Sequence, residues 1–136
     1  MEMKYIAPDG TEVPRPDIVF LEQRIRNEPA QYWNYQTCIA TIQLIDTAGP
    51  QLIFAVRSDL GVLVHFCSAD GSDQFVLTQA REQIDDGKVS IFYGGDNWLV
   101  PRSYFVSVET ALSAMAEFLS SQRRLSDFNW IALGYD

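Results

Sequence analysis

The sequence predicts an α+β fold, in which an antiparallel meander of about five to six strands carries an N-terminal and a C-terminal helix on one face. Three observations lead to this prediction. Runs with the two-residue apolar period of strands follow one another through short turns. Segments with the apolar period of a helix stand before and after these runs. The length of 136 residues suits one domain, so we expect residues 1–136 to form a single unit.

The N-terminal part predicts an arm followed by a helix. Residues 1–15 are polar and marked by proline and glycine, which is typical of an irregular arm or a short edge strand. A helix is expected from Pro16 to about Asn27, and Glu28-Pro29 ends it because proline disfavours helix in the residue before it. The apolar stripe of this helix consists of Ile18, Leu21 and Ile25.

The middle of the chain predicts the meander. Thr37 to Ile45 is rich in β-branched residues and alternates. Gln51 to Arg57 is apolar on both faces and is therefore expected to be a central strand. Val62 to Cys67 follows after a short turn, and Gln74 to Thr78 predicts another short strand. The segment from Ala80 to Asp86 is interpreted as a loop or one helical turn.

The last third of the chain predicts a hairpin and a helix. Lys88 to Tyr93 alternates as a half-buried strand does, and the turn residues Gly94 to Asn97 lead into a short strand interrupted by Pro101. Ser107 occupies the expected N-cap of the helix, with Glu109 in the first turn. The apolar stripe of that helix consists of Val108, Ala111, Leu112, Met115 and Leu119.

The charge pattern predicts an acidic surface. The formal net charge is −8, and the region from Ser58 to Asp96 holds seven acidic and two basic residues. Such a surface repels nucleic acid and anionic lipid, and it attracts a basic protein. General solubility is the simpler explanation, and on charge alone we place it ahead of a basic partner. The acidic residues of this region are Asp59, Asp70, Asp73, Glu82, Asp85, Asp86 and Asp96.

The candidate catalytic residues are few. His65 is the only histidine, and it shares a strand face with Cys67, so a base and a nucleophile can be imagined there. We favour a structural role for both, and we interpret Cys38 and Cys67 as buried reduced thiols. No motif for a cofactor or a metal ion is present, so no cofactor is expected.

The remaining candidates belong to turns and to one aromatic residue. The carboxylate pairs Asp70/Asp73 and Asp85/Asp86 are interpreted as solvated turn residues rather than as acid–base or cation sites. Trp98 follows the Gly-Gly turn, where a large ring is expected to be partly exposed. It is either an interface anchor or a cover for the sheet edge.

Over roughly Leu52 to Leu133 the sequence resembles a known family. The residues that carry the resemblance are Leu52-Ile-Phe-Ala-Val56, Ser58-Asp59, Val62-Leu-Val-His-Phe66, Phe92-Tyr-Gly-Gly95, the helix from Ser107 to Phe118, Gln122-Arg123 and Trp130. They are similar to the first-numbered immunity protein family of bacterial polymorphic and contact-dependent toxin systems. Some members of that family neutralise cytosine-deaminase toxins.

The resemblance implies a binding protein that neutralises a cognate toxin in the cytoplasm and catalyses nothing. We expect a partner with a basic surface, neither nucleic acid nor membrane, and the N-terminus lacks the pattern of a signal peptide. The residues predicted to bind the toxin are Asp70, Asp73, Asp85, Asp86, Tyr93, Asp96 and Trp98. The alternatives are a small α+β enzyme or ligand-binding domain with its site near His65 and Cys67, or a subunit of a larger assembly.

Overall fold

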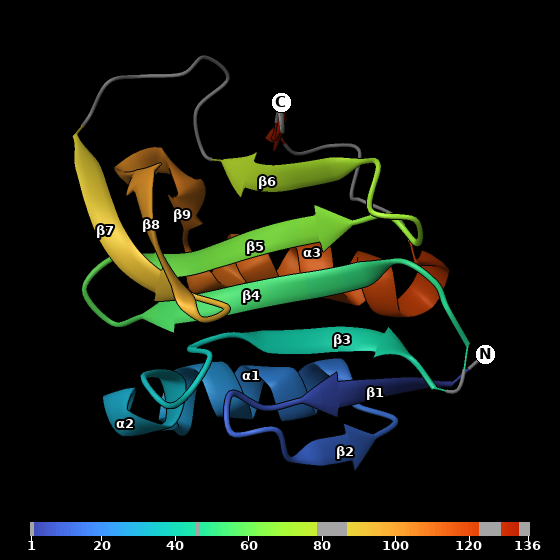
Figure 1. Ribbon diagram of the computed structural model, residues 1–136. Coiled ribbons are helices and arrows are strands. Elements are labelled where there is room, and N and C mark those ends of the chain that lie inside the picture. The colour runs from blue at the N-terminus through green and yellow to red at the C-terminus, as the bar shows by residue number, and fades with distance from the viewer. Residues whose placement is uncertain (1, 46, 79–86, 123–128, 134–136) are drawn as a thin grey trace.

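The computed structural model describes residues 2–45, 47–78, 87–122 and 129–133 (Figure 1). Its helices are α1 (Ile18–Asn27), α2 (Ala30–Trp33) and α3 (Val108–Ser121), and a 3-10 turn η1 spans Arg102–Tyr104. The main sheet contains β1 (Met3–Ile6), β2 (Glu12–Pro14), β3 (Ala40–Leu44), β4 (Gln51–Arg57), β5 (Gly61–Cys67), β6 (Gln74–Thr78), β9 (Phe105–Val106) and β10 (Asn129–Ala132). A separate two-stranded sheet contains β7 (Lys88–Tyr93) and β8 (Asp96–Pro101).

The sheet topology confirms the α+β class and the meander. Consecutive strands β3, β4, β5 and β6 pair antiparallel, in the order β10-β6-β5-β4-β3-β1-β2, with β9 beside β5. The expectation of about five to six strands was too low, because both chain ends add strands. Residues 1–15 contribute the β1–β2 hairpin beside β3, and the C-terminal tail pairs with β6 as β10.

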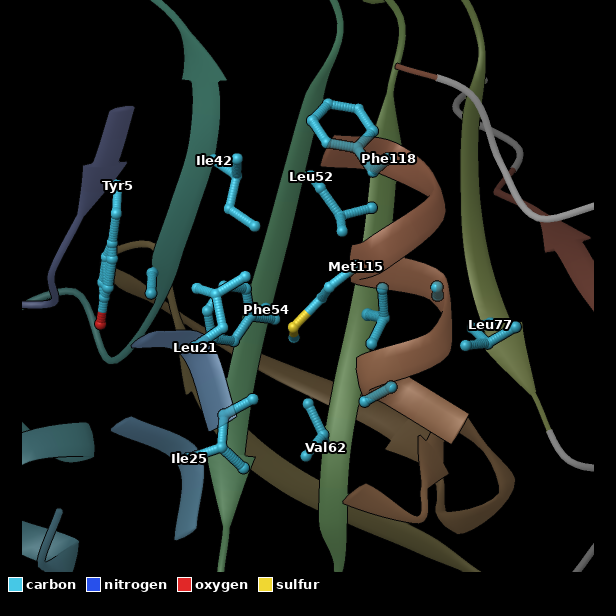
Figure 2. Packing of buried hydrophobic residues seen from close by; sticks show 14 of the residues in the cluster. Tyr5, Leu21, Ile25, Ile42, Leu52, Phe54, Val62, Leu77, Met115 and Phe118 are labelled. Carbon is cyan, nitrogen blue, oxygen red and sulfur yellow. The ribbon is translucent and has the colours of Figure 1, made fainter. Parts of the chain in front are cut away.

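Two layers cover the two faces of the sheet. Helices α1 and α3 lie behind it, and the β7–β8 hairpin crosses in front of it (Figure 1). A larger apolar core fills the space between the helices and the sheet, and Figure 2 shows Leu21, Phe54, Met115 and Phe118 meeting there. A second cluster lies under the hairpin and includes Ile91. Strand β4 is central and apolar on both faces, as predicted, because each face has its own cover.

The local signals for the two long helices are confirmed. Asp17 accepts the backbone N–H of Phe20 at 2.8 Å, and Ser107 accepts that of Thr110 at 3.2 Å, so each helix begins at a side chain that satisfies a free N–H group. An ion pair at 3.5 Å between Arg26 and Glu109 also links the two helices. Among the described residues, no helix combines the length and apolarity that a bilayer crossing needs.

One strand is shorter than predicted. The expected strand began at Thr37, whereas β3 begins at Ala40. Gln36 and Cys38 have left-handed backbones, with φ of 50° and 61°, which interrupt an extended chain. The predicted loop or helical turn at 80–86 lies outside the described residues, as do Asp85 and Asp86.

Candidate functional site

The β7–β8 hairpin carries most of the described residues that the sequence predicted as binding residues. Its register pairs Ile91 with Trp98 and Tyr93 with Asp96, and the turn between the strands uses positive φ at both Gly94 and Gly95. Residues opposite one another across an antiparallel pair share a face. The structure therefore brings Tyr93 and Trp98 to the same, inner face of the hairpin.

The inner face packs on the second core cluster. The rings of Tyr93 and Trp98 lie 5.0 Å apart, and Trp98 also lies 6.4 Å from the ring of Tyr104. Both Tyr93 and Trp98 are half-buried. Each ring is exposed in part, and its buried part packs against the cluster under the hairpin.

The outer face of the hairpin exposes two apolar side chains. Phe92 is 44% exposed and Leu99 is 61% exposed, whereas Ile91 on the other face is 5% exposed. Phe92 and Leu99 were not among the predicted binding residues. The alternation of β7 contained the signal, because the residues on either side of Phe92 face the core and leave a large ring on the solvent side.

A hydrogen-bonded chain connects the hairpin to the β5–β6 turn. The Nε2 atom of Gln74 donates to the carbonyl of Gly71 at 3.3 Å, which orients its Oε1 atom toward His65. That oxygen accepts from Nε2–H of His65 at 2.8 Å, and Nδ1 of His65 accepts from the hydroxyl of Tyr93 at 2.9 Å. His65 is therefore a buried linker between strands rather than an open catalytic base.

The acidic residues of the β5–β6 turn lie next to this chain. Asp70 accepts hydrogen bonds from Ser72 Oγ at 2.7 Å, Ser72 N–H at 3.0 Å and Ser68 Oγ at 2.9 Å. These bonds, led by that of the Ser72 hydroxyl, lower the pKa of Asp70 to about 2. Asp70 is thus both a negative charge and a structural part of its turn. Asp73 in the same turn and Asp96 on the hairpin are exposed.

The geometry does not favour a catalytic Cys67. Its thiol lies 3.5 Å from the carbonyl of Ser68, and burial, together with the charge of Asp70, raises the pKa of the thiol. A raised pKa disfavours the thiolate that a nucleophile requires. Both ring nitrogens of His65 are already bonded to Tyr93 and Gln74.

We expect stability to depend on the protonation of His65. Burial lowers its pKa below the ordinary 6.5, although the hydrogen bond to Gln74 opposes the shift. The unfolded chain therefore binds a proton at a higher pH than the folded chain does. The free energy of unfolding should fall as the pH drops below about 6.5, by at most about 1.4 kcal/mol per pH unit for one proton.

Urea unfolding at a series of pH values from about 7 to about 5 measures this dependence. The variant His65→Gln lacks the titrating group, so its free energy of unfolding should depend less steeply on pH. The difference between the two slopes is the contribution of His65, because the other groups titrate in both proteins. Equal slopes for the two proteins would contradict the assignment of His65 as a buried neutral linker.

Comparison with known proteins gives one family. The model of the family described as Immunity protein Imm1 matches residues 21–132, which is well over half of the 136-residue chain. A search of curated proteins finds no match. The matched range contains α1 from Leu21 onward, the meander, the whole β7–β8 hairpin and α3. The chain therefore belongs to the Imm1 family of immunity proteins.

Proposed function

We propose that this protein neutralises a cognate toxin domain by forming a stoichiometric complex with it in the cytoplasm. The observation that carries the proposal is the match of the immunity family over residues 21–132. The family points to a role in binding rather than catalysis. The bonding of His65 and the raised pKa of Cys67 also argue against an enzyme with its site at these two residues.

The proposed binding surface combines charge and apolar contact. The exposed Asp70, Asp73 and Asp96 supply its negative charge. The proposal also includes Asp85 and Asp86, which lie outside the described residues. Four side chains of the hairpin supply apolar contact area. They are the half-buried Tyr93 and Trp98 and the exposed Phe92 and Leu99. Interfaces of this kind are held by a few large desolvated anchors inside a charged rim.

The proposed toxin acts on nucleic acid, and the family resemblance suggests a cytosine deaminase. A protein that binds nucleic acid presents a basic surface to phosphates. A protein of net charge −8 is electrostatically complementary to such a basic surface, so attraction accelerates its association with the toxin. Association steered in this way reaches about 10⁸–10⁹ per molar per second at low salt. Occupation of the basic surface would exclude the substrate.

Charge reversal tests the electrostatic part of this proposal. We expect Asp73→Lys and Asp96→Lys to lower the association rate on the order of tenfold at low salt and to flatten its salt dependence. Asp70→Lys is less informative because Asp70 also holds its turn together. Stopped-flow or biosensor kinetics with the cognate toxin domain measures the rate.

The matched control is Glu117→Lys, which changes the net charge equally but lies on α3, in the layer behind the sheet (Figure 1). The association rate of this variant should stay near that of the unaltered protein. If the reversals at Asp70, Asp73, Asp85, Asp86 and Asp96 all leave the rate and its salt dependence unchanged, the acidic surface is not where the toxin binds.

A further inference from the structure

Strand β4 extends beyond the end of its neighbour β3. The β3–β4 pairing ends where Ala40 meets Phe54, whereas β4 continues to Arg57 and pairs with β5 as far as Gly61. The last residues of β4, from Ala55 to Arg57, therefore have a strand on one side only. An unpaired strand edge is a template on which another extended chain can pair.

The register shows which backbone groups face the open side. The N–H of Ser68 donates to the carbonyl of Asp73 at 2.9 Å, in register with the β5–β6 pairing. Because the backbone groups of successive residues in a strand point to opposite sides, the even-numbered residues of β5 form backbone hydrogen bonds with β6 and the odd-numbered ones with β4. The odd-numbered residues of β4 consequently bond to β5, and Val56 directs its N–H and C=O to the open side. Neither group of Val56 has a backbone partner among the described residues.

The open edge is built into the fold. Gln36 and Cys38, just before β3, have left-handed backbones. They direct this part of the chain away from β4, so β3 does not begin early enough to pair with the last residues of β4. Such a conformation costs roughly 1–2 kcal/mol per non-glycine residue. The hairpin turn holds the diverted segment, because Gly94 N–H donates to the carbonyl of Thr37 at 2.9 Å. The edge beside Val56 is therefore kept open by specific contacts.

Two pockets meet at this edge and lie on opposite faces of the sheet. The larger, of about 210 Å³, lies on the helix side and is lined by residues of α1 and α3 such as Ile25 and Val108. The smaller, of about 50 Å³, lies on the hairpin side and is lined by Ile91 and Phe92. We call the two together the edge groove. The residues common to both pockets are Trp33, Asn34, Val56 and Arg57.

We propose that the edge groove receives an extended segment of the toxin, which pairs with Val56 as an added strand. The side chains of such a strand alternate between the faces of the sheet, so one enters the larger pocket and the next enters the smaller. A cavity of about 150 Å³ admits benzene, so the larger pocket has the volume for one large side chain and the smaller one only for a small residue. The larger pocket is lined by the apolar Ile25 and Val108 and also by charged residues such as Arg57. This inference rests on the proposed function.

The charge of the protein argues for a toxin segment rather than a second copy of this chain. Two copies would each bring a net charge of −8 to the contact, whereas a basic toxin domain is electrostatically complementary. The groove also adjoins the proposed binding surface, because Phe92 belongs to both. One continuous toxin surface can therefore cover the hairpin and enter the groove.

Trp33 adds an unmet hydrogen-bonding group to the same place. It is 3% exposed and its indole N–H has no acceptor among the described residues. A buried donor without a partner costs about 1–3 kcal/mol.

The first test fills the larger pocket. Ala30 lines that pocket and is exposed, whereas Gln31, the next residue of α2, is exposed and lines neither pocket. We expect Ala30→Trp to weaken binding of the catalytically inactivated cognate toxin domain by at least about tenfold, because one occupied pocket removes an anchor. Gln31→Trp should bind like the unaltered protein. Thermal unfolding checks that both variants fold.

The second test measures amide hydrogen exchange at the unpaired edge of β4. In the free protein the N–H of Val56 should exchange faster than those of Ala55 and Arg57, which bond to β5. In the complex we expect exchange at Val56 to slow by at least about a hundredfold.

The outcomes separate the two proposals. If the unaltered protein does not bind the toxin domain, the proposed function fails, and the groove inference fails with it. If it binds, but Ala30→Trp binds equally well and the exchange of Val56 is unchanged, only the groove inference is overturned.

Discussion

Replacement of Phe54 by alanine should destabilise the protein by about 3–5 kcal/mol. Phe54 is fully buried in the middle of β4 (Figure 2). Its ring lies 6.3 Å from that of Tyr5 and 5.8 Å from that of Trp33. Its loss leaves a cavity between β4 and α1 that rigid neighbours fill only in part. For a chain of this size, the loss corresponds to a fall in melting temperature of roughly 10–20 °C.

Calorimetry or circular dichroism during heating measures the effect. Phe92→Ala is the matched control, because it removes the same ring from a position that is 44% exposed on the hairpin. The control should unfold within about 1 kcal/mol of the unaltered protein. A similar loss of stability for both variants would mean that Phe54 is not the central core residue described here.

The double variant Phe92→Ala with Leu99→Ala should weaken toxin binding by about 30-fold or more while the fold remains intact. Both side chains are exposed on the outer face of the hairpin, so their removal creates no internal cavity. In a complex both would be desolvated near the centre of the interface, and we expect the pair to contribute about 2 kcal/mol or more in total, which is about 30-fold in Kd. Isothermal titration with the inactivated toxin domain gives the change in Kd.

Val19→Ala is the control for this prediction. Val19 is 58% exposed on α1, in the layer behind the sheet. The substitution therefore removes exposed apolar surface from a region that we place outside the interface. Its Kd should equal that of the unaltered protein. A double hairpin variant that binds as tightly as Val19→Ala would exclude the outer face of the hairpin from the interface.

The parts of the fold that depend on local chemistry were predictable. Asp17 and Ser107 begin helices because their side chains bond to N–H groups three residues ahead, and that pattern is visible in the sequence. The central position of β4 follows from apolar residues on both of its faces.

The pairing partners of the chain ends were not predictable, although a short edge strand was one expectation for residues 1–15. The N-terminal hairpin joins β3, and β10 joins β6, by backbone bonds that place few demands on side chains. The short β3 was also hidden, because Gln36 and Cys38 adopt backbone conformations that their side chains do not favour. The open edge at Val56 results from that diversion, and no residue type marks it.

Part of the candidate site could be predicted from the sequence. The alternation of β7 places Tyr93 on the inner face and Phe92 on the outer face. Because Ile91, Phe92 and Tyr93 are consecutive large apolar or aromatic residues, the sequence does not make the exposure of Phe92 obvious. The bond from Tyr93 to His65 joins residues far apart in the chain, so only the structure reveals it. The proposed role of Asp70, Asp73, Asp85, Asp86 and Asp96 stays a prediction from charge.

The most direct test of binding without catalysis is a titration of toxin activity. The cognate toxin domain is held at a concentration well above Kd, and the purified protein is added in steps while turnover of the toxin's substrate is followed. We expect activity to fall linearly and to vanish at about one molar equivalent. Full toxin activity at about tenfold excess of this protein would contradict the account.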